Sequence, residues 1–124
     1  MGWRIIERLT NRRHKPAPPA PGDLVTVVVE DQFGVMKILV VDEGGVHARL
    51  FVERFAQRPS NLDGSGLSLA AFGTEHNNPF SIGHVPLSHK SFSAWKPQLC
   101  GRSVVVDEEL EGYRMWRDAK AGYF

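Results

Sequence analysis

The sequence predicts a mainly β fold with α additions (α+β), in which a small antiparallel barrel is closed by a C-terminal helix. Three observations lead to this class. Apolar, β-branched runs fill most of residues 24–52. Short turn-forming stretches separate these runs, and the clearest helical patterns come only after Leu87. Because a sheet hides its edges when it curls and closes on itself, short strands of this kind favour a barrel.

The chain divides into an N-terminal arm over residues 1–21 and one folded domain over residues 22–124. The 124 residues, 42% hydrophobic and 23% charged, are enough for a globular domain with a buried core. The arm ends in the stretch PAPPAP (16–21), which predicts a stiff, extended spacer. We therefore expect the domain to begin near Gly22 and to form an SH3-like barrel.

The arm is the basic part of the chain. Its five basic residues are Arg4, Arg8, Arg12, Arg13 and Lys15. One acid opposes them, so the arm carries a net charge of +4; because the whole chain carries +1, the domain carries −3. A domain that binds nucleic acid usually has its positive charge on the folded face, which is the reverse of this distribution.

The first half of the domain predicts three strands. Residues 24–30 (LVTVVVE) and 35–41 (VMKILVV) are typical of strands with at least one buried face. Residues 42–45 (DEGG) predict a tight hairpin, because the two glycines can adopt the positive φ that the reversal requires. Residues 46–52 then alternate apolar and polar side chains, which is the period of a half-buried strand.

Two further short strands are expected after a loop of small turn-forming residues. One covers residues 67–72, and the other covers residues 84–87 at a sheet edge, where Pro86 is tolerated. Ser88 then predicts the N-cap of a helical segment over residues 89–95.

The C-terminal part predicts a last strand over residues 101–106 and a final helix. Asp107 is expected to cap this helix, because a side-chain oxygen there can accept from the free backbone N–H groups. Leu110, Tyr113 and Trp116 recur at helical spacing and form its apolar stripe. This is the helix that we expect to close the barrel.

Two stretches of the domain carry a resemblance. The first opens PGDLVTV and continues FGVMKILVVDEGGVHARLF, with matching positions Gly22, Asp23, Phe33, Gly34, Val35, Lys37 and Leu39. The second is IGHVPLSHKSFSAWKPQL, with matching positions Ile82, Gly83, His84, Pro86, Leu87 and Trp95, and EELEGYRMW follows it. Over residues 22–118 the chain resembles small bacterial SH3-like barrel proteins near the immunity proteins of contact-dependent and polymorphic toxin systems. The resemblance implies a protein that blocks a partner without catalysis, and it carries over no shared site residues.

The residues themselves predict no catalytic site, no metal site and no cofactor. His84 and His89 are five residues apart across a predicted strand-to-helix junction, which is not the spacing of a helical zinc motif. No serine lies in a GxSxG turn, and GSG at 64–66 is too short to be a phosphate-binding glycine loop. We therefore expect that the protein is not an enzyme.

A protein-binding module is the function that the sequence favours. The loops at 55–66 and 73–83 are long for a domain of this size, and such loops usually carry function. Aromatic, Arg and Asn side chains suit a recognition surface. The predicted partner-binding residues are Phe55, Arg58, His76, Asn77, Asn78 and Phe80. For Phe55 and Phe80 the alternative is that they plug the ends of the barrel.

Nucleic-acid binding is the alternative function. It would use the five basic residues of the arm, together with phenylalanine and arginine side chains of the domain on which bases could stack. The net negative charge of the domain opposes this alternative, because it repels phosphate.

The single cysteine, Cys100, cannot form an intrachain disulfide, which fits a reducing cytoplasm. No apolar stretch approaches the roughly 18 residues that a transmembrane helix requires. We therefore expect a cytoplasmic protein whose partner is another protein, a toxin being one candidate, and the oligomeric state stays open.

Overall fold

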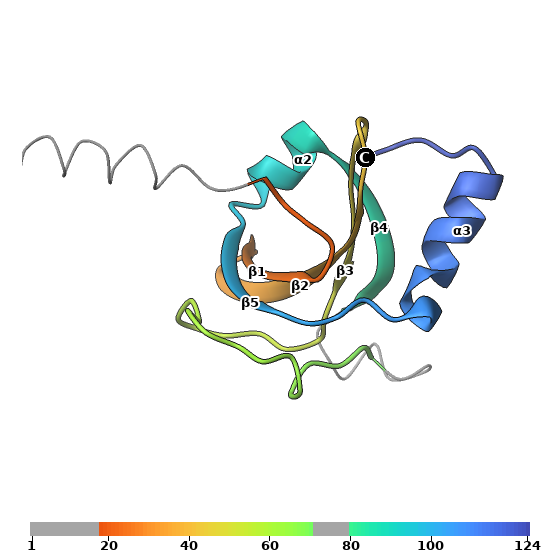
Figure 1. Cartoon of the computed structure of the whole chain (residues 1–124). Coiled ribbons are helices and arrows are strands. Elements are labelled where there is room, and N and C mark those ends of the chain that lie inside the picture. Colours follow the sequence, from red (N-terminus) through yellow and green to blue (C-terminus); the bar gives the residue numbers. More distant parts are fainter. Residues whose placement is uncertain (1–17, 71–79) are drawn as a thin grey trace, which may run out of the picture.

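The computed structural model describes residues 18–70 and 80–124 and shows one antiparallel sheet with short helices around it (Figure 1). The five strands are β1 (Asp23–Val29), β2 (Gln32–Val41), β3 (Gly45–Leu50), β4 (Ile82–Ser88) and β5 (Gln98–Arg102). The helical elements are α2 (His89–Ala94), the 3-10 turn η1 (Asp107–Leu110) and α3 (Glu111–Asp118). The predicted class, mainly β with α additions, is confirmed.

The strand order is β4-β3-β2-β1-β5, so β4 and β5 are the two edges of the sheet. Within residues 18–70 and 80–124 no ladder joins these two edges. The expected closed barrel is therefore not observed, and the sheet is bent but open. The reason lies in α2, which connects β4 to β5 and places Phe92 and Trp95 against the inner core. The C-terminal helix does not close the sheet either, because it packs on the outer face.

Most predicted strands are present with shifted ends. The predictions over 24–30, 35–41, 46–52 and 84–87 correspond to β1, β2, β3 and β4. The prediction over 67–72 is wrong for residues 67–70, which form an irregular loop, and residues 71–72 lie outside the described part. The last strand was expected over 101–106 but spans residues 98–102, because these residues are the ones that pair with β1.

Asp42 forms the hairpin turn between β2 and β3. Its Oδ1 accepts hydrogen bonds from the backbone N–H groups of Gly44 and Gly45, each at 2.9 Å. Neither glycine has a positive φ, so that part of the prediction is wrong. Close approach requires glycine here instead, because a Cβ on Gly45 would lie 2.0 Å from the carbonyl oxygen of Leu87. A Cβ on Gly44 would lie 2.4 Å from the ring of Tyr123.

The main hydrophobic core lies on the inner face of the sheet. It contains the buried residues Val25, Val27, Val29, Met36, Ile38, Val46, Ala48, Leu50, Val85 and Leu87. Phe92 of α2 also belongs to it and is only 6% exposed. The predicted N-cap of this helix is confirmed, because Ser88 Oγ accepts from the backbone N–H of Ser91 at 3.1 Å. The helix α2 therefore covers one end of the inner core.

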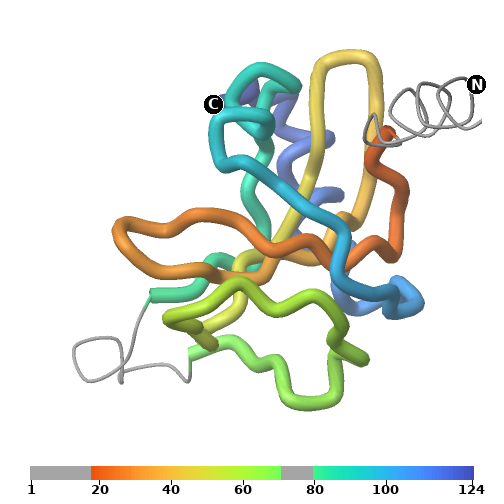
Figure 2. Tube along the Cα trace, turned by 90° about the vertical axis from the view of Figure 1, so that its left-hand side faces the viewer, coloured from red at the N-terminus to blue at the C-terminus, as the bar shows by residue number. Residues whose placement is uncertain are grey.

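A smaller core lies on the opposite face, under the loop at 51–70 that Figure 2 shows in yellow-green and green along one side of the sheet. Its members are Leu24, Val35, Phe51 and Cys100, with Phe55, Leu62 and Leu67 packed against them. The loop is attached by a hydrogen bond from the Leu62 N–H to the Cys100 carbonyl, at 2.7 Å. This face of β1 and β2 is therefore also shielded from solvent.

The elements η1 and α3 cover the remaining outer face, over β3 and β4 (Figure 1). Asp107 is the first residue of η1 rather than its cap, and the helix begins as a 3-10 turn before α3. Glu109 provides the cap instead, because its Oε1 accepts from the Val106 N–H at 3.0 Å. In the described part of the chain, no helix combines the length and the apolar character needed to cross a membrane.

Residues 122–124, called the C-terminal segment below, return to the edge of β4. The Phe124 N–H donates to the Pro86 carbonyl, and the Ser88 N–H donates to the Phe124 carbonyl, each at 2.9 Å. Trp116 of α3 donates from its indole N–H to the Gly122 carbonyl at 2.8 Å. The segment thus covers part of an edge that would otherwise expose unpaired backbone groups.

Candidate functional site

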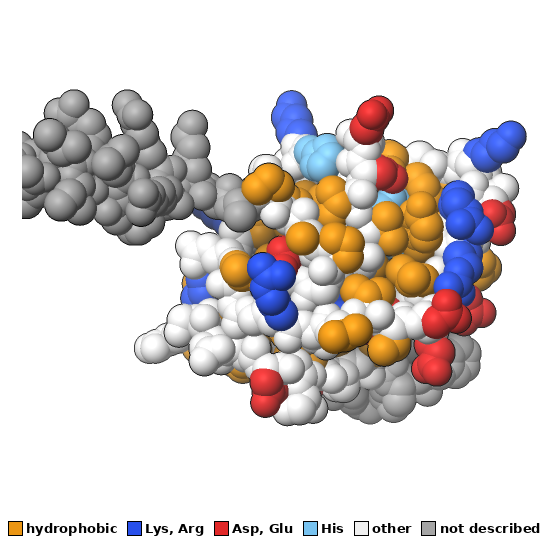
Figure 3. Space-filling model, viewed as in Figure 1, with side chains coloured by type: hydrophobic (Ala, Val, Ile, Leu, Met, Phe, Trp, Pro, Cys, Tyr) orange, Lys and Arg blue, Asp and Glu red, His pale blue; other side chains and the backbone are white. Residues whose placement is uncertain are grey.

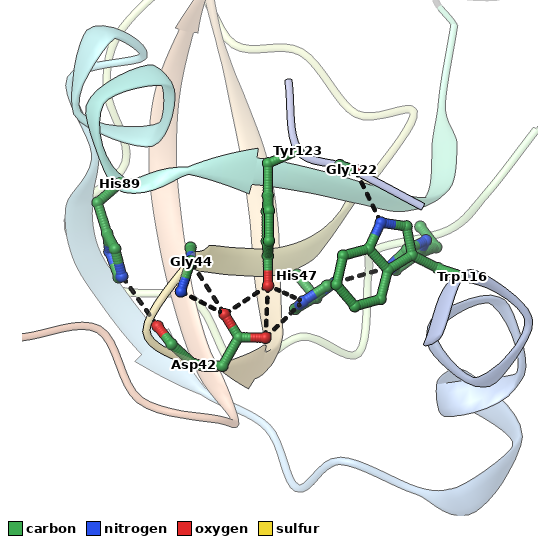
Figure 4. Close-up of polar contacts among 9 residues, drawn as sticks. Asp42, Gly44, His47, His89, Trp116, Gly122 and Tyr123 are labelled. Atoms are coloured by element: carbon green, nitrogen blue, oxygen red, sulfur yellow. Dashed lines mark hydrogen bonds and ion pairs between the residues drawn. The ribbon is translucent and has the colours of Figure 1, made fainter. Parts of the chain in front are cut away.

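A polar cluster lies between the outer face of the sheet and the C-terminal segment. It consists of Asp42, His47, His84 and Tyr123 and is called the histidine cluster below. Figure 4 labels Asp42, His47 and Tyr123 of this cluster. The hairpin turn supplies Asp42, the neighbouring strands β3 and β4 supply the two histidines, and the C-terminal segment supplies Tyr123.

His47 is the centre of this cluster, and its side chain is fully buried. Its Nδ1 lies 3.0 Å from His84 Nε2, and its Nε2 lies 3.2 Å from both Asp42 Oδ2 and the Tyr123 hydroxyl. A carboxylate can only accept, so the Nε2 of a neutral His47 carries the proton that faces Asp42. Its Nδ1 then accepts a hydrogen bond from His84 Nε2–H.

Aromatic rings enclose the same imidazole. The rings of Tyr113 and Trp116 on α3 lie 4.7 and 4.4 Å from His47 between centroids, and the ring of Tyr123 lies 5.3 Å away. The predicted stripe of α3 does point at the sheet, but the residue that it covers is a histidine rather than an apolar side chain. Edge contacts of this kind stabilise an imidazole against aromatic faces.

Asp42 connects three segments of the chain. Besides the two glycine N–H groups of the hairpin and His47, its carboxylate accepts from the Tyr123 hydroxyl. Its carbonyl accepts from His89 Nε2 in α2 at 2.9 Å. The carboxylate side chain is 36% exposed, so solvent reaches the cluster at this residue.

The surroundings lower the pKa of both histidines. Burial, and then the charge of a protonated His47, lower the pKa of His84 to about 4. Burial also lowers the pKa of His47, although Asp42 acts in the opposite direction. Burial would raise the pKa of Asp42, but hydrogen bonds from Tyr123, the Gly45 N–H and His47 together lower it. At neutral pH the cluster therefore holds two neutral imidazoles and one carboxylate.

The hydrogen bonds of this cluster attach the C-terminal segment to the sheet. A carboxylate, an imidazole and a second imidazole in a row can orient a proton, as in a relay. Here, however, the hydrogen bonds of His47 and Asp42 go to Tyr123 and the hairpin, and aromatic rings cover the imidazole. Among the described residues, no group of three or more His, Cys, Asp or Glu side chains is placed to hold a metal ion.

A second buried polar group attaches η1 to the sheet. Lys37 of β2 is 4% exposed, and its Nζ donates to Glu109 Oε1 at 2.8 Å and to the Val104 carbonyl at 2.7 Å. Arg49 of β3 lies 3.4 Å from the other oxygen of Glu109. Burial would raise the pKa of Glu109, but Lys37 and the Val106 N–H together lower it. This carboxylate is therefore a structural ion-pair partner rather than a solvated start of a helix.

A groove of about 860 Å³ lies between α2, β5 and residues 18–25, and it is called the α2–β5 groove below. Three segments line it: residues 18–25, helix α2 with the turn after it, and β5. The residues at its surface include Pro18, Pro19, Val25, Phe92, Pro97 and Leu99 as apolar groups, with Asp23, His89, Lys96, Gln98 and Arg102 as polar groups. Figure 3 shows apolar and basic side chains side by side on the face that carries β5 and residues 18–25.

Asp23 is the buried charged residue of this groove, with 6% of its surface exposed. Its Oδ2 accepts from the Ala20 N–H at 3.0 Å. Its Oδ1 lies 3.5 Å from a guanidinium nitrogen of Arg102 but has no hydrogen-bond partner among the described residues. A buried carboxylate oxygen without a donor is uncommon in folded proteins and calls for an explanation.

Three of the predicted partner-binding residues, Phe55, Arg58 and Phe80, lie in the described part of the chain. Phe55 packs against the smaller core and pairs with Phe33. Arg58 lies over the Phe33 ring at 4.8 Å and donates to the Lys96 carbonyl at 2.9 Å. Phe80 is 45% exposed.

Phe80 belongs to a shallow pocket of about 350 Å³ that Trp95 and the end of β1 also line. Arg54 lies over its ring at 5.2 Å and donates to its carbonyl. His76, Asn77 and Asn78 lie outside the described residues, as do the five basic residues of the arm.

Neither the histidine cluster nor the α2–β5 groove could be predicted from the sequence pattern. His47 and His84 are 37 positions apart, and they meet because β3 pairs with β4 with a register shift between Ala48 and Leu50. The one local signal was the polar His47 within an alternating strand. The groove gave no signal, because its lining comes from three separate segments.

Comparisons with protein-family models, with curated proteins and with solved structures found no match to this chain.

Proposed function

We propose that this chain is a non-catalytic protein-binding module that works in the cytoplasm. The observation that carries this proposal is the α2–β5 groove, which combines apolar lining with exposed basic side chains at about 860 Å³. That is within the usual size range of ligand sites, roughly 300–1,000 Å³, and a mixed apolar and polar lining is typical of recognition sites.

The histidine cluster supports binding over catalysis. A general base must face a substrate, whereas His47 is buried and faces Asp42, His84 and Tyr123 of the same chain. The buried Lys37–Glu109 pair is likewise used within the chain to hold η1. The titratable groups buried on the outer face thus serve the scaffold.

We further propose that the scaffold is an SH3-like barrel that is open between β4 and β5. The strand order supports this proposal, because the pairing of β5 with β1 brings the last strand back to the first. The short helix α2 lies between the two edge strands in sequence and fills the inner core there. In a scaffold of this kind, partners usually bind at surface loops and grooves, and the α2–β5 groove is such a site.

An immunity-type inhibitor, which blocks a toxin by binding to it, is the form of this function that the sequence resemblance implies. The experiment therefore looks for a protein toxin from the same cells as the bound partner. The alternative, nucleic-acid binding through the basic arm, is separated from it by the same experiment.

The full chain, tagged and crosslinked in its own cells, is purified with and without nuclease, and the retained molecules are identified by mass spectrometry. We expect one protein to be retained in stoichiometric amount after nuclease treatment. The purified pair should then form again from its two components. Loss of every retained molecule on nuclease treatment would contradict the proposal and favour the nucleic-acid alternative.

A further inference from the structure

The α2–β5 groove offers three kinds of contact in one place. Val25 and Phe92 form an apolar base, each about 5–6% exposed, and Leu99 is 56% exposed beside them. Prolines 18, 19 and 97 form parts of the walls, and they present apolar rings without backbone N–H donors. A short extended chain that inserts one apolar side chain would bury this surface.

Asp23 supports the groove from a buried position. Its Oδ2 accepts from the Ala20 N–H, and its Oδ1 lies 3.5 Å from a guanidinium nitrogen of Arg102. Because Oδ1 is buried, this ion pair orients Arg102 at the groove, and the exposed part of the Arg102 side chain is what a ligand meets.

The exposed charges at the groove are basic. Arg102 has a side chain that is 71% exposed, and Lys96 is also exposed. The one acid of the groove, Asp23, lies within 3.5 Å of Arg102 and offsets only part of this charge. Charge complementarity therefore favours a ligand with carboxylate side chains.

The same charges argue against two other occupants. The N-terminal arm of this chain carries a net charge of +4 and would meet Lys96 and Arg102 with the same sign. A nucleic acid is held through several phosphates and by bases stacked on exposed aromatic rings, whereas the lining has two Lys or Arg side chains, Lys96 and Arg102, and the Phe92 ring is only 6% exposed.

We propose that the α2–β5 groove binds a linear, acidic segment of a partner protein in an extended conformation. An apolar side chain of the segment packs on Leu99 and the prolines of the walls. A neighbouring carboxylate pairs with Lys96 or Arg102. This inference rests on the proposed function and names the chemistry of the partner.

The test uses the immobilised full chain and a random library of 12-residue peptides displayed on phage. We expect the selected peptides to share an acidic residue next to an apolar one. A synthetic copy of the strongest peptide should bind Arg102→Glu and Leu99→Glu at least about tenfold more weakly than the parent chain. Its affinity should also fall as salt is raised from about 0.05 to 0.5 M, because the contacts include exposed charges.

Matched controls are available on α3. Arg117→Glu makes the same charge change at a side chain that is 55% exposed, and Met115→Glu matches Leu99→Glu at a residue that is 68% exposed. Both controls should bind the peptide as the parent does, and circular dichroism should show all four variants folded. Equal loss in the controls, failure to select any peptide, or selection of basic peptides resembling residues 1–17 would overturn the proposal.

One result separates this inference from the proposed function. If Arg102→Glu and Leu99→Glu still retain the partner found by crosslinking, the groove assignment is wrong and the binding function stands.

Discussion

At the scale of single residues, His47 shows how a polar side chain is accommodated in a dry position. It lies at a fully buried point of the outer face, where an apolar residue would be the ordinary choice. Both of its ring nitrogens have partners, and three aromatic rings contact it. A buried polar group that is fully satisfied in this way fixes one arrangement of its neighbours.

His47→Ala should lower the free energy of unfolding by about 2–4 kcal/mol. The substitution leaves a cavity among Tyr113, Trp116 and Tyr123 and removes a hydrogen-bond partner of Asp42. Urea denaturation followed by circular dichroism measures the change. His89→Ala is the control, since His89 is exposed, and it should change the free energy by less than about 1 kcal/mol. Equal effects of the two substitutions would show that burial of His47 contributes little.

Gly45→Val should lower the free energy of unfolding by about 2 kcal/mol or more. The cause is contact rather than backbone strain, because a Cβ would lie 2.0 Å from the backbone oxygen of Leu87. Gly66→Val is the matched control, because a Cβ at Gly66 has no atom within 4 Å among its described surroundings. Thermal unfolding measures both variants, and a melting temperature of Gly45→Val equal to that of the control would refute the contact argument.

At the scale of secondary-structure elements, the edge strand β4 is paired on both sides. β3 occupies one side, and the C-terminal segment forms two backbone hydrogen bonds on the other, at Pro86 and Ser88. A three-residue segment is too short to hold this position by backbone pairing alone. The Tyr123 hydroxyl on Asp42 and the Trp116 indole on Gly122 supply the additional attachment.

Tyr123→Phe should loosen the C-terminal segment without unfolding the domain. Loss of the hydroxyl removes hydrogen bonds to Asp42, and one bond of this kind is worth about 1–1.5 kcal/mol. The amide hydrogens of Ser88 and Phe124, measured by NMR, should therefore exchange about tenfold faster. Tyr113→Phe removes the hydroxyl from the other tyrosine beside His47 and should leave both exchange rates unchanged. If Tyr123→Phe exchanges as slowly as that control, the hydroxyl does not hold the segment.

Local sequence patterns correctly predicted the strands, turns and caps that are determined by neighbouring residues in the sequence. The alternation over residues 46–52 and the hairpin at 42–45 correspond to β3 and its turn, and Ser88 caps α2 as expected. The end of β5 at Arg102 was missed, because pairing with β1 decides it and not the apolar run at 104–106. Val104 is 83% exposed, which shows that an apolar run alone does not define a strand.

At the scale of the whole molecule, both faces of the sheet are covered. The inner face holds the main core under α2, and the outer face is shared by the smaller core, the Lys37–Glu109 pair and the histidine cluster. The sites therefore depend on segments distant in sequence, such as β5 and residues 18–25 at the groove. Composition and periodicity do not show which distant segments come into contact. For this reason the sequence suggested a binding surface in the long loops instead.

The free energy of unfolding should fall as the pH is lowered from 7 to 5. The folded state lowers the pKa of His84 to about 4, whereas a histidine in the unfolded chain titrates near 6.5. Between these values the unfolded chain binds more protons, so acid favours it. Among the described residues, the titratable groups that face His84 or its partner are Asp42, His47, Tyr113 and Tyr123, and Asp42 stays charged over this range.

After allowance for partial exposure of His84, the expected decrease is about 1–2 kcal/mol. Urea denaturation at pH 7, 6 and 5 measures it. His84→Gln should be less sensitive to pH over this range, because it has one fewer imidazole to protonate on unfolding. A variant with the same pH dependence as the parent would show that His84 is not the responsible group.

The position of Cys100 makes its thiol a reporter of how the loop at 51–70 opens. The thiol lies in the smaller core, 3% exposed, between the sheet and the loop at 51–70, and burial raises its pKa. A thiol reagent reacts with the exposed thiolate, so modification must wait until the loop lifts from β5. Because the chain has one cysteine, the rate at which Ellman's reagent modifies the protein reports on this opening: it approaches the opening rate when the reagent is in large excess, and it reflects the fraction of open protein when modification is slow. A peptide bound in the α2–β5 groove contacts β5 from its other side, and its effect on that rate would show whether binding and opening are coupled.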